Sequence, residues 1–168
     1  MENFEFYTPT KIYFGRDTHK KVGEIIAGYG FHKILLHYGG GSIHRSGLYS
    51  AIVASLREHN IEWVELGGVT PNPKLSLAKQ GMELCRTENV EFILAAGGGS
   101  VLDSAKCIAD GVANPGVETW EFFEKKKEPQ GALPVGSILT LAASGSEMSA
   151  SCVITNEDGW LKKGVNYE

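Results

Sequence analysis

Short apolar runs alternate with amphipathic stretches along most of this chain of 168 residues. Four runs predict strands of a sheet: residues 33–38, 61–66, 92–96 and 135–143. All but 61–66 are nearly continuous in apolar residues, as in buried parallel strands. Between and before them, apolar positions recur at helical spacing and predict four helices: residues 17–28, 48–59, 75–89 and 101–112. This alternation predicts an α/β fold of the Rossmann-like kind, with a doubly wound, mostly parallel sheet and helices on both faces.

The two ends of the chain depart from this alternation. Residues 4–9 and 10–15 alternate apolar and polar positions, which predicts two short strands or a hairpin near a sheet edge. Beyond Asn114 a long loop region carries one amphipathic turn at residues 120–123. Residues 151–156 predict one more strand, and no closing helix follows it. Asp17 is expected to cap the first helix.

Composition narrows the class of protein. The length and the 42% apolar content suit one domain, residues 1–168, with a sizeable core. The net charge of -4 and scattered basic residues make nucleic acid and anionic membranes poor partners. Three widely spaced cysteines without a CxxC pair suggest a reducing compartment. With no signal-peptide pattern and no apolar run of about 20 residues, we expect a soluble, cytoplasmic protein.

The sequence Gly97-Gly98-Gly99-Ser100 directly follows a predicted buried strand and precedes a predicted helix. Three glycines allow close approach of a ligand to backbone N–H groups, and the positive end of the helix dipole favours an anion such as a pyrophosphate. Ser100 is expected to cap the helix, with Asp103 completing a capping box. The spacing matches neither GxGxxG nor a Walker loop, so a glycine-rich turn that only packs the helix on the strand stays open.

The longer stretch GGGSVLDSAK, residues 97–106, resembles the GGGSxxDxAK signature of the iron-dependent, or group III, alcohol dehydrogenases. Four further segments resemble that family in order and spacing: residues 3–15, YGGGS at 38–42, PNP at 71–73 and LTLAASGSEMSASCVITN at 139–156. The resemblance covers the whole chain and is greatest to the butanol dehydrogenase and NADPH-dependent aldehyde reductase branch. It implies a cofactor domain similar to that of dehydroquinate synthase-like enzymes.

The resemblance also implies a C-terminal α-helical domain that supplies one Asp and three His to a divalent metal, often iron or zinc. The sequence ends at Glu168, before that domain would begin. The five histidines all precede the glycine loop and show no i, i+4 pair, so they are expected to be structural or solvated. We therefore expect no metal ligands in this chain and little activity from it alone. A fragment, a truncation and one piece of a split enzyme all remain open.

The resemblance implies a set of cofactor contacts. The backbone of the glycine loop would hold the pyrophosphate, and Asp103 would lie near the nicotinamide, although no residue is assigned as catalytic. Thr140 and Ser144 resemble hydroxyl contacts to the adenine side and the phosphates. Asn72 matches a loop position close to the cofactor, and Lys162 matches a lysine near the nicotinamide ribose. The glycine-loop residues are Gly97, Gly98, Gly99 and Ser100.

A second GGGS follows the strand at residues 33–38. Dinucleotide folds typically carry an acidic residue here, which binds the adenosine ribose and repels a 2′-phosphate. This chain has Gly39, Gly40 and Ser42 instead, with His44 and Arg45 just beyond. We therefore expect NADP(H) to be preferred over NAD(H), and the alternative is that these glycines only form a turn.

The leading hypothesis is thus the cofactor-binding half of an oxidoreductase that transfers hydride between NADP(H) and a primary alcohol or aldehyde with metal assistance. The alternatives are a non-catalytic nucleotide-binding module, a glycerol dehydrogenase-like enzyme and a phosphotransferase. A phosphotransferase needs acidic residues that hold Mg²⁺ near the phosphates, and the sequence offers only Asp103 for this role. The resemblance also implies a homodimer.

Overall fold

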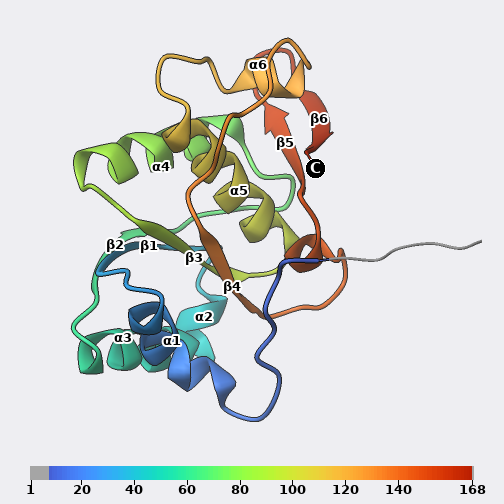
Figure 1. Cartoon of the computed structure of the whole chain (residues 1–168). Coiled ribbons are helices and arrows are strands. Elements are labelled where there is room, and N and C mark those ends of the chain that lie inside the picture. Colours follow the sequence, from blue (N-terminus) through green and yellow to red (C-terminus); the bar gives the residue numbers. More distant parts are fainter. Residues whose placement is uncertain (1–7, 168) are drawn as a thin grey trace, which may run out of the picture.

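The computed structural model describes residues 8–167 and consists of a parallel sheet between two layers of helices, with a small hairpin beside it (Figure 1). The strands are β1 (Lys33–Tyr38), β2 (Glu62–Leu66), β3 (Phe92–Gly97), β4 (Val135–Leu139), β5 (Ser151–Asn156) and β6 (Leu161–Asn166). The α-helices are α1 (Val22–Gly28), α2 (Ser42–Arg45), α3 (Leu48–Glu58), α4 (Leu75–Thr87), α5 (Gly99–Ala113) and α6 (Trp120–Phe123). Two 3-10 helices, η1 (Thr18–Lys21) and η2 (Ser146–Met148), complete the set.

The main sheet has the strand order β2-β1-β3-β4, and all of its neighbouring strands are parallel. Helices α1 and α3 cover one face, and α4 and α5 cover the other (Figure 1). The prediction of a doubly wound α/β fold is therefore confirmed.

Alternation of side chains along the central strands produces the two cores. In β1, Ile34 and Leu36 pack toward α1 and α3, whereas Leu35 packs toward α4 and α5. The side chains of all three are fully buried. Since both faces of these strands are covered, the strands carry continuous apolar runs, as parallel sheets between helices do.

Strands β5 and β6 form a separate antiparallel hairpin. Its apolar side chains Cys152, Ile154 and Val165 belong to the core that includes α5. The sequence predicted a strand at 151–156 but not its partner β6. Outside the hairpin, the Thr155 N–H of β5 donates to the Pro73 carbonyl at 2.8 Å, just before α4, and the strand is not part of the main sheet.

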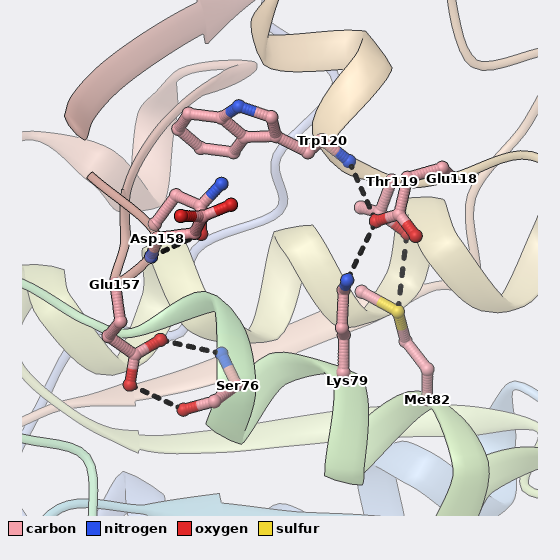
Figure 2. A network of polar contacts seen from close by, with 9 residues as sticks. Ser76, Lys79, Met82, Glu118, Thr119, Trp120, Glu157 and Asp158 are labelled. Atoms are coloured by element: carbon pink, nitrogen blue, oxygen red, sulfur yellow. Dashed lines mark hydrogen bonds and ion pairs between the residues drawn. The ribbon is translucent and has the colours of Figure 1, made fainter. Parts of the chain in front are cut away.

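Polar contacts hold the hairpin and the loop before α6 onto α4 (Figure 2). The Glu157 carboxylate accepts hydrogen bonds from the Ser76 N–H at 3.1 Å and from the Ser76 hydroxyl at 2.6 Å. It thereby accepts a hydrogen bond from a free N–H in the first turn of α4. In many helices the side chain of the N-cap residue takes this role. Farther along α4, Lys79 forms an ion pair of 2.8 Å with Glu118.

Two sequence predictions near the N-terminus need correction. The predicted strand at residues 10–15 is wrong, because residues 8–14 form no strand, and Ile12 and Phe14 are 61% and 98% exposed without a partner strand in the described chain. The companion prediction for residues 4–9 falls largely on residues outside the described range. Asp17 makes no side-chain cap; it has a φ of 59° and pairs with Lys20 at 3.1 Å, and η1 precedes α1.

The predicted strand at residues 135–143 is also too long. β4 ends at Leu139, and residues 140–145 are exposed as they turn away from the sheet. Within residues 8–167, no helix has the length and apolar character needed to cross a membrane.

Candidate functional site

The four parallel strands end at one edge of the sheet, so the loops that follow them lie together. The Gly68 N–H donates to the Gly39 carbonyl at 2.8 Å, which joins the loops after β1 and β2. The Thr140 N–H donates to the Gly97 carbonyl at 3.0 Å, which joins the ends of β3 and β4. Both GGGS segments therefore lie at the C-terminal ends of the parallel strands.

The second glycine loop leads directly into the longest helix, α5. Gly98 is the N-cap residue, and its carbonyl accepts from Val101 N–H at 2.9 Å. The N–H groups of Gly99 and Ser100 have no hydrogen-bond acceptor among residues 8–167. Together with the helix dipole, they form a site suited to an anion.

The prediction that Ser100 caps this helix is wrong. The helix begins at Gly99, which places Ser100 inside its first turn, and no side chain caps the N-terminus. The capping-box role of Asp103 is wrong as well. Its carboxylate accepts from the Ser146 hydroxyl at 2.7 Å and from the Val153 N–H at 3.2 Å, so it binds the following segments rather than its own helix end.

The three glycines of this loop serve different purposes. A Cβ on Gly97 would lie 2.4 Å from the Val101 side chain, and one on Gly99 would lie 2.3 Å from the Ser144 hydroxyl oxygen, so both positions need glycine for packing. A Cβ on Gly98 would meet only Leu141, at an ordinary 3.8 Å. Gly98 therefore leaves space that a ligand can use.

The loop after β4 brings the predicted hydroxyl residues to this glycine loop. Ser144 lies against Gly99, and Thr140 is joined to Gly97 through its backbone. Both residues are exposed, as is Leu141 between them at 67%. The far end of the loop is fixed to α5 by Asp103 and by Lys106, whose ammonium donates to oxygens of residues 146–151.

The predicted residues Asn72 and Lys162 lie next to each other although 90 positions separate them. Lys162 Nζ donates to Asn72 Oδ1 at 2.7 Å. They line a pocket together with Pro71, Lys74, Thr155 and Trp160. Thr155 is 8% exposed, and its hydroxyl oxygen is buried without a hydrogen-bond partner among the described residues.

The first glycine loop lies beside an aromatic cluster that holds one carboxylate. Glu65 accepts hydrogen bonds from the Tyr49 hydroxyl at 2.5 Å, from Trp63 Nε1 at 3.0 Å and from the Tyr38 hydroxyl at 3.0 Å. Burial favours the neutral acid, but these hydrogen bonds outweigh it and lower the pKa of Glu65. The His44 ring packs against Tyr49, with centroids 4.4 Å apart. The Glu65 carboxylate is thus engaged by three donors of the protein.

The first glycine loop itself is open. A Cβ on Gly40 would meet no atom within 4 Å, and one on Gly39 would lie 3.3 Å from the Val69 carbonyl oxygen. The N–H groups of Gly40 and Ser42 have no acceptor among the described residues. Ser42 is the first residue of α2, and Arg45 follows at its end.

His37 connects β1, on which it lies, to β2 and α5. Its side chain is fully buried, with Nδ1 2.8 Å from the Leu66 carbonyl oxygen and Nε2 2.9 Å from the Ser104 hydroxyl. Since the carbonyl only accepts, Nδ1 carries the proton and Nε2 accepts from Ser104. The expectation of a structural histidine holds for this residue.

No group of three or more His, Cys, Asp or Glu side chains within residues 8–167 is placed to hold a metal ion. The residues described therefore do not fit a metal centre of their own.

Sequence reasoning missed several residues of the site. Trp160 carries no local motif, and Thr155 lies in the quoted segment 139–156 but was not assigned a contact; only the fold brings both to the pocket. Lys106 lies within the quoted signature, but its acceptors are 40 to 45 positions away.

The chain is similar in sequence and in fold to known proteins. The sequence profile of a family described as "Iron-containing alcohol dehydrogenase" matches residues 9–168. A curated relative, the probable NADH-dependent butanol dehydrogenase 1 of Bacillus subtilis, is 46% identical, and the match covers 98% of this chain and 42% of the relative. An NADPH-dependent aldehyde reductase of Escherichia coli is 36% identical over 94% of this chain and 40% of that protein.

A solved structure, that of NADH-dependent butanol dehydrogenase A from Thermotoga maritima, superposes with a TM-score of 0.96 at 48% identity. It is matched over 100% of this chain and 42% of that chain. The chain thus spans about two fifths of the length of these relatives.

Proposed function

Because this chain belongs to the iron-containing alcohol dehydrogenase family, we propose that it is the cofactor-binding part of an oxidoreductase acting on primary alcohols or aldehydes. In this proposal, hydride passes between the substrate carbon and a nicotinamide cofactor bound along the sheet edge. Butanol dehydrogenases and an aldehyde reductase among its relatives support the substrate class. Since the chain spans only about two fifths of these relatives, the activity of a whole enzyme is part of the proposal.

The observation that carries the proposal is the free N-terminus of α5. Two N–H groups without acceptors, at Gly99 and Ser100, point out of a 15-residue helix beside the open position of Gly98. A pyrophosphate fits this combination, because its oxygens accept from the N–H groups and its charge interacts favourably with the helix dipole. Thr140 and Ser144 add hydroxyl donors at the same place.

We further propose that the pocket at Asn72 and Lys162 receives the nicotinamide ribose. A ribose presents hydroxyl groups that both donate and accept. The amide of Asn72 and the ammonium of Lys162 complement such groups. Asp103 then acts mainly by fixing the loops around this ligand, since both of its oxygens already accept hydrogen bonds.

We propose that the cofactor is NADP(H) rather than NAD(H). No carboxylate stands at Gly39 or Gly40, and Glu65, which binds the Tyr38 hydroxyl just before this loop, is engaged by three donors. Backbone N–H groups without acceptors and the nearby Arg45 favour a 2′-phosphate at this loop. Relatives named for NADH and for NADPH both occur, so similarity does not choose between the two cofactors.

A metal, iron or zinc, would polarise the substrate oxygen in such an enzyme. The described residues do not provide its ligands, so we assign the metal to a part of the enzyme outside this chain. A phosphotransferase receives no support from the site, because the carboxylate of Asp103 is held by Ser146 and Val153.

A titration of this chain with NADPH and NADH, followed by fluorescence, tests the proposal. NADPH is expected to bind more tightly, and Gly98→Val should abolish binding of both cofactors while leaving the circular dichroism spectrum unchanged, since Gly98 has space toward the protein. Gly40→Asp, also at an open position, should weaken NADPH binding and spare NADH.

If wild type binds NADPH and NADH equally well, and Gly40→Asp does not change the ratio of the two affinities, the NADP(H) preference is refuted. Full binding by Gly98→Val would refute the pyrophosphate site. Gly28 is the last residue of α1 and also has space for a side chain. Gly28→Val is therefore the matched control and should bind the cofactors as the wild type does. Cofactor binding without any activity, even after a catalytic partner domain and metal are added, would favour the non-catalytic module.

A further inference from the structure

The ammonium group of Lys106 occupies an unusual position in this fold. Lys106 lies in the second turn of α5 and is half-buried. Its Nζ lies 2.6 Å from the Ser146 carbonyl oxygen, 2.7 Å from that of Ser149 and 2.9 Å from that of Ser151. The Ser146 hydroxyl is a fourth neighbour at 3.0 Å. One short segment thus wraps around a single charged group.

An ammonium group has only three protons, so four oxygens exceed what it can bind by separate hydrogen bonds. Three of the oxygens are main-chain carbonyls that converge on one point. Converging carbonyl dipoles repel one another unless a cation lies between them, and inside a protein such unpaired groups are costly. The segment therefore needs a positive charge at this place to keep its conformation.

The segment held in this way belongs to the loop that borders the pyrophosphate site. The loop begins at Thr140, where the backbone is joined to Gly97, and it places Ser144 against Gly99. Two residues later, the Ser146 hydroxyl donates to Asp103 and accepts from Lys106. Lys106 thus ties this loop to α5.

We propose that Lys106 is a positioning residue for cofactor binding, with its ammonium acting as a built-in monovalent cation that organises residues 144–151. This inference deepens the proposed function and rests on it, because it assigns to this loop a role in binding the cofactor. Lys106 does not contact the ligand itself and acts through the loop. Burial lowers the pKa of Lys106, and the nearby carboxylates of Asp103, Asp110 and Glu147 oppose this shift.

The test uses Lys106→Ala in the full chain, with and without added propylammonium. Propylammonium replaces the atoms that alanine lacks, from Cγ to Nζ. Two quantities are measured: amide hydrogen exchange in residues 144–153, without cofactor, and NADPH affinity by fluorescence. The control is Lys79→Ala, which removes an exposed ammonium on α4 that pairs only with Glu118 among the described residues.

Lys106→Ala is expected to speed exchange in residues 144–153 and to weaken NADPH binding, each by about tenfold or more, in line with the loss of charge-assisted hydrogen bonds. Exchange in β1 and β3 should stay slow, propylammonium should restore both quantities, and Lys79→Ala should change neither. Unchanged exchange in residues 144–153, or no recovery with propylammonium, would overturn the inference. If Lys106→Ala fails to fold, and propylammonium does not restore its circular dichroism spectrum, the inference is likewise overturned.

The experiment separates the two proposals. If the wild type does not bind NADPH, the proposed function fails, and hydrogen exchange still reports whether the Lys106 charge organises the loop. If the wild type binds NADPH and Lys106→Ala binds it equally well, only the positioning role is lost.

Discussion

Acidification should destabilise this domain through one residue, His37, and the structure sets the size of the effect. The imidazole is fully buried in β1 and is neutral, with Nδ1–H donating to the Leu66 carbonyl and Nε2 accepting from Ser104. Burial lowers the pKa of His37 from 6.5 to about 4, and the hydrogen bond to Leu66 opposes this only in part. The folded protein therefore resists protonation at a group that the unfolded chain protonates readily.

The sign and the magnitude follow from proton linkage. Since the folded pKa is below the unfolded one, the stability from neutral His37 is fully present above pH 6.5 and is lost as the pH falls toward 4. At about 1.4 kcal/mol for each pH step, the whole loss is about 3 kcal/mol. Most of it, about 2.5 kcal/mol, falls between about pH 7.5 and about pH 4.5. This is a large part of the stability of a typical domain.

The assay is urea unfolding of wild type and His37→Gln at about pH 7.5 and about pH 4.5. Glutamine does not titrate, so the free energy of unfolding of wild type should fall relative to that of His37→Gln by about 2.5 kcal/mol on acidification. His32→Gln, which replaces an exposed histidine, should follow the wild type. A constant difference between wild type and His37→Gln across this range would refute the reasoning.

A second buried group titrates in the same range with the opposite sign, which is why the variant is compared with wild type at each pH. Burial raises the pKa of Asp110 from 3.8 to about 7, and the charge of Lys106 opposes this. Its folded pKa is above its unfolded one, so the cost of this group is absent below pH 3.8 and complete above about pH 7. The contribution of Asp110 to the free energy of unfolding is the same in wild type and in His37→Gln, so it cancels when the two are compared at one pH.

Three further changes have expected outcomes. Asp110→Asn should raise the free energy of unfolding in urea by about 2 kcal/mol at neutral pH and leave it unchanged below pH 4, because it removes a buried charge; equal gains at both would contradict this. Gly99→Ala should weaken NADPH binding about tenfold by pushing on Ser144, and Ser144→Gly added to it should recover part of the loss in the same titration. Glu157→Gln should lower stability by about 1 kcal/mol, measured by thermal unfolding, since Ser76 loses a charged acceptor.

Much of the fold follows from local pattern. Continuous apolar runs such as 33–38 and 92–96 identify strands covered on both faces, because only such strands lack a polar side. Apolar positions at helical spacing located α3, α4 and α5 to within a few residues. The prediction failed at residues 10–15, where alternation alone indicated a strand, because a strand also needs a partner to bond with its backbone. It also missed β6, whose polar sequence LKKGVN gave no strand pattern.

By itself, the sequence determined the α/β fold, the family and the two glycine loops, because apolar periodicity, glycine and short motifs act over neighbouring residues. Tertiary structure alone decided what each side chain contacts. Asp103 binds Ser146 and Val153 rather than the end of its own helix, and Lys106 binds the same distant loop. Lys162 meets Asn72 only after β6 folds back on β5. The physical reason is that hydrogen bonds and burial depend on distances in space, which residues 40 to 90 positions apart acquire only when the chain has packed.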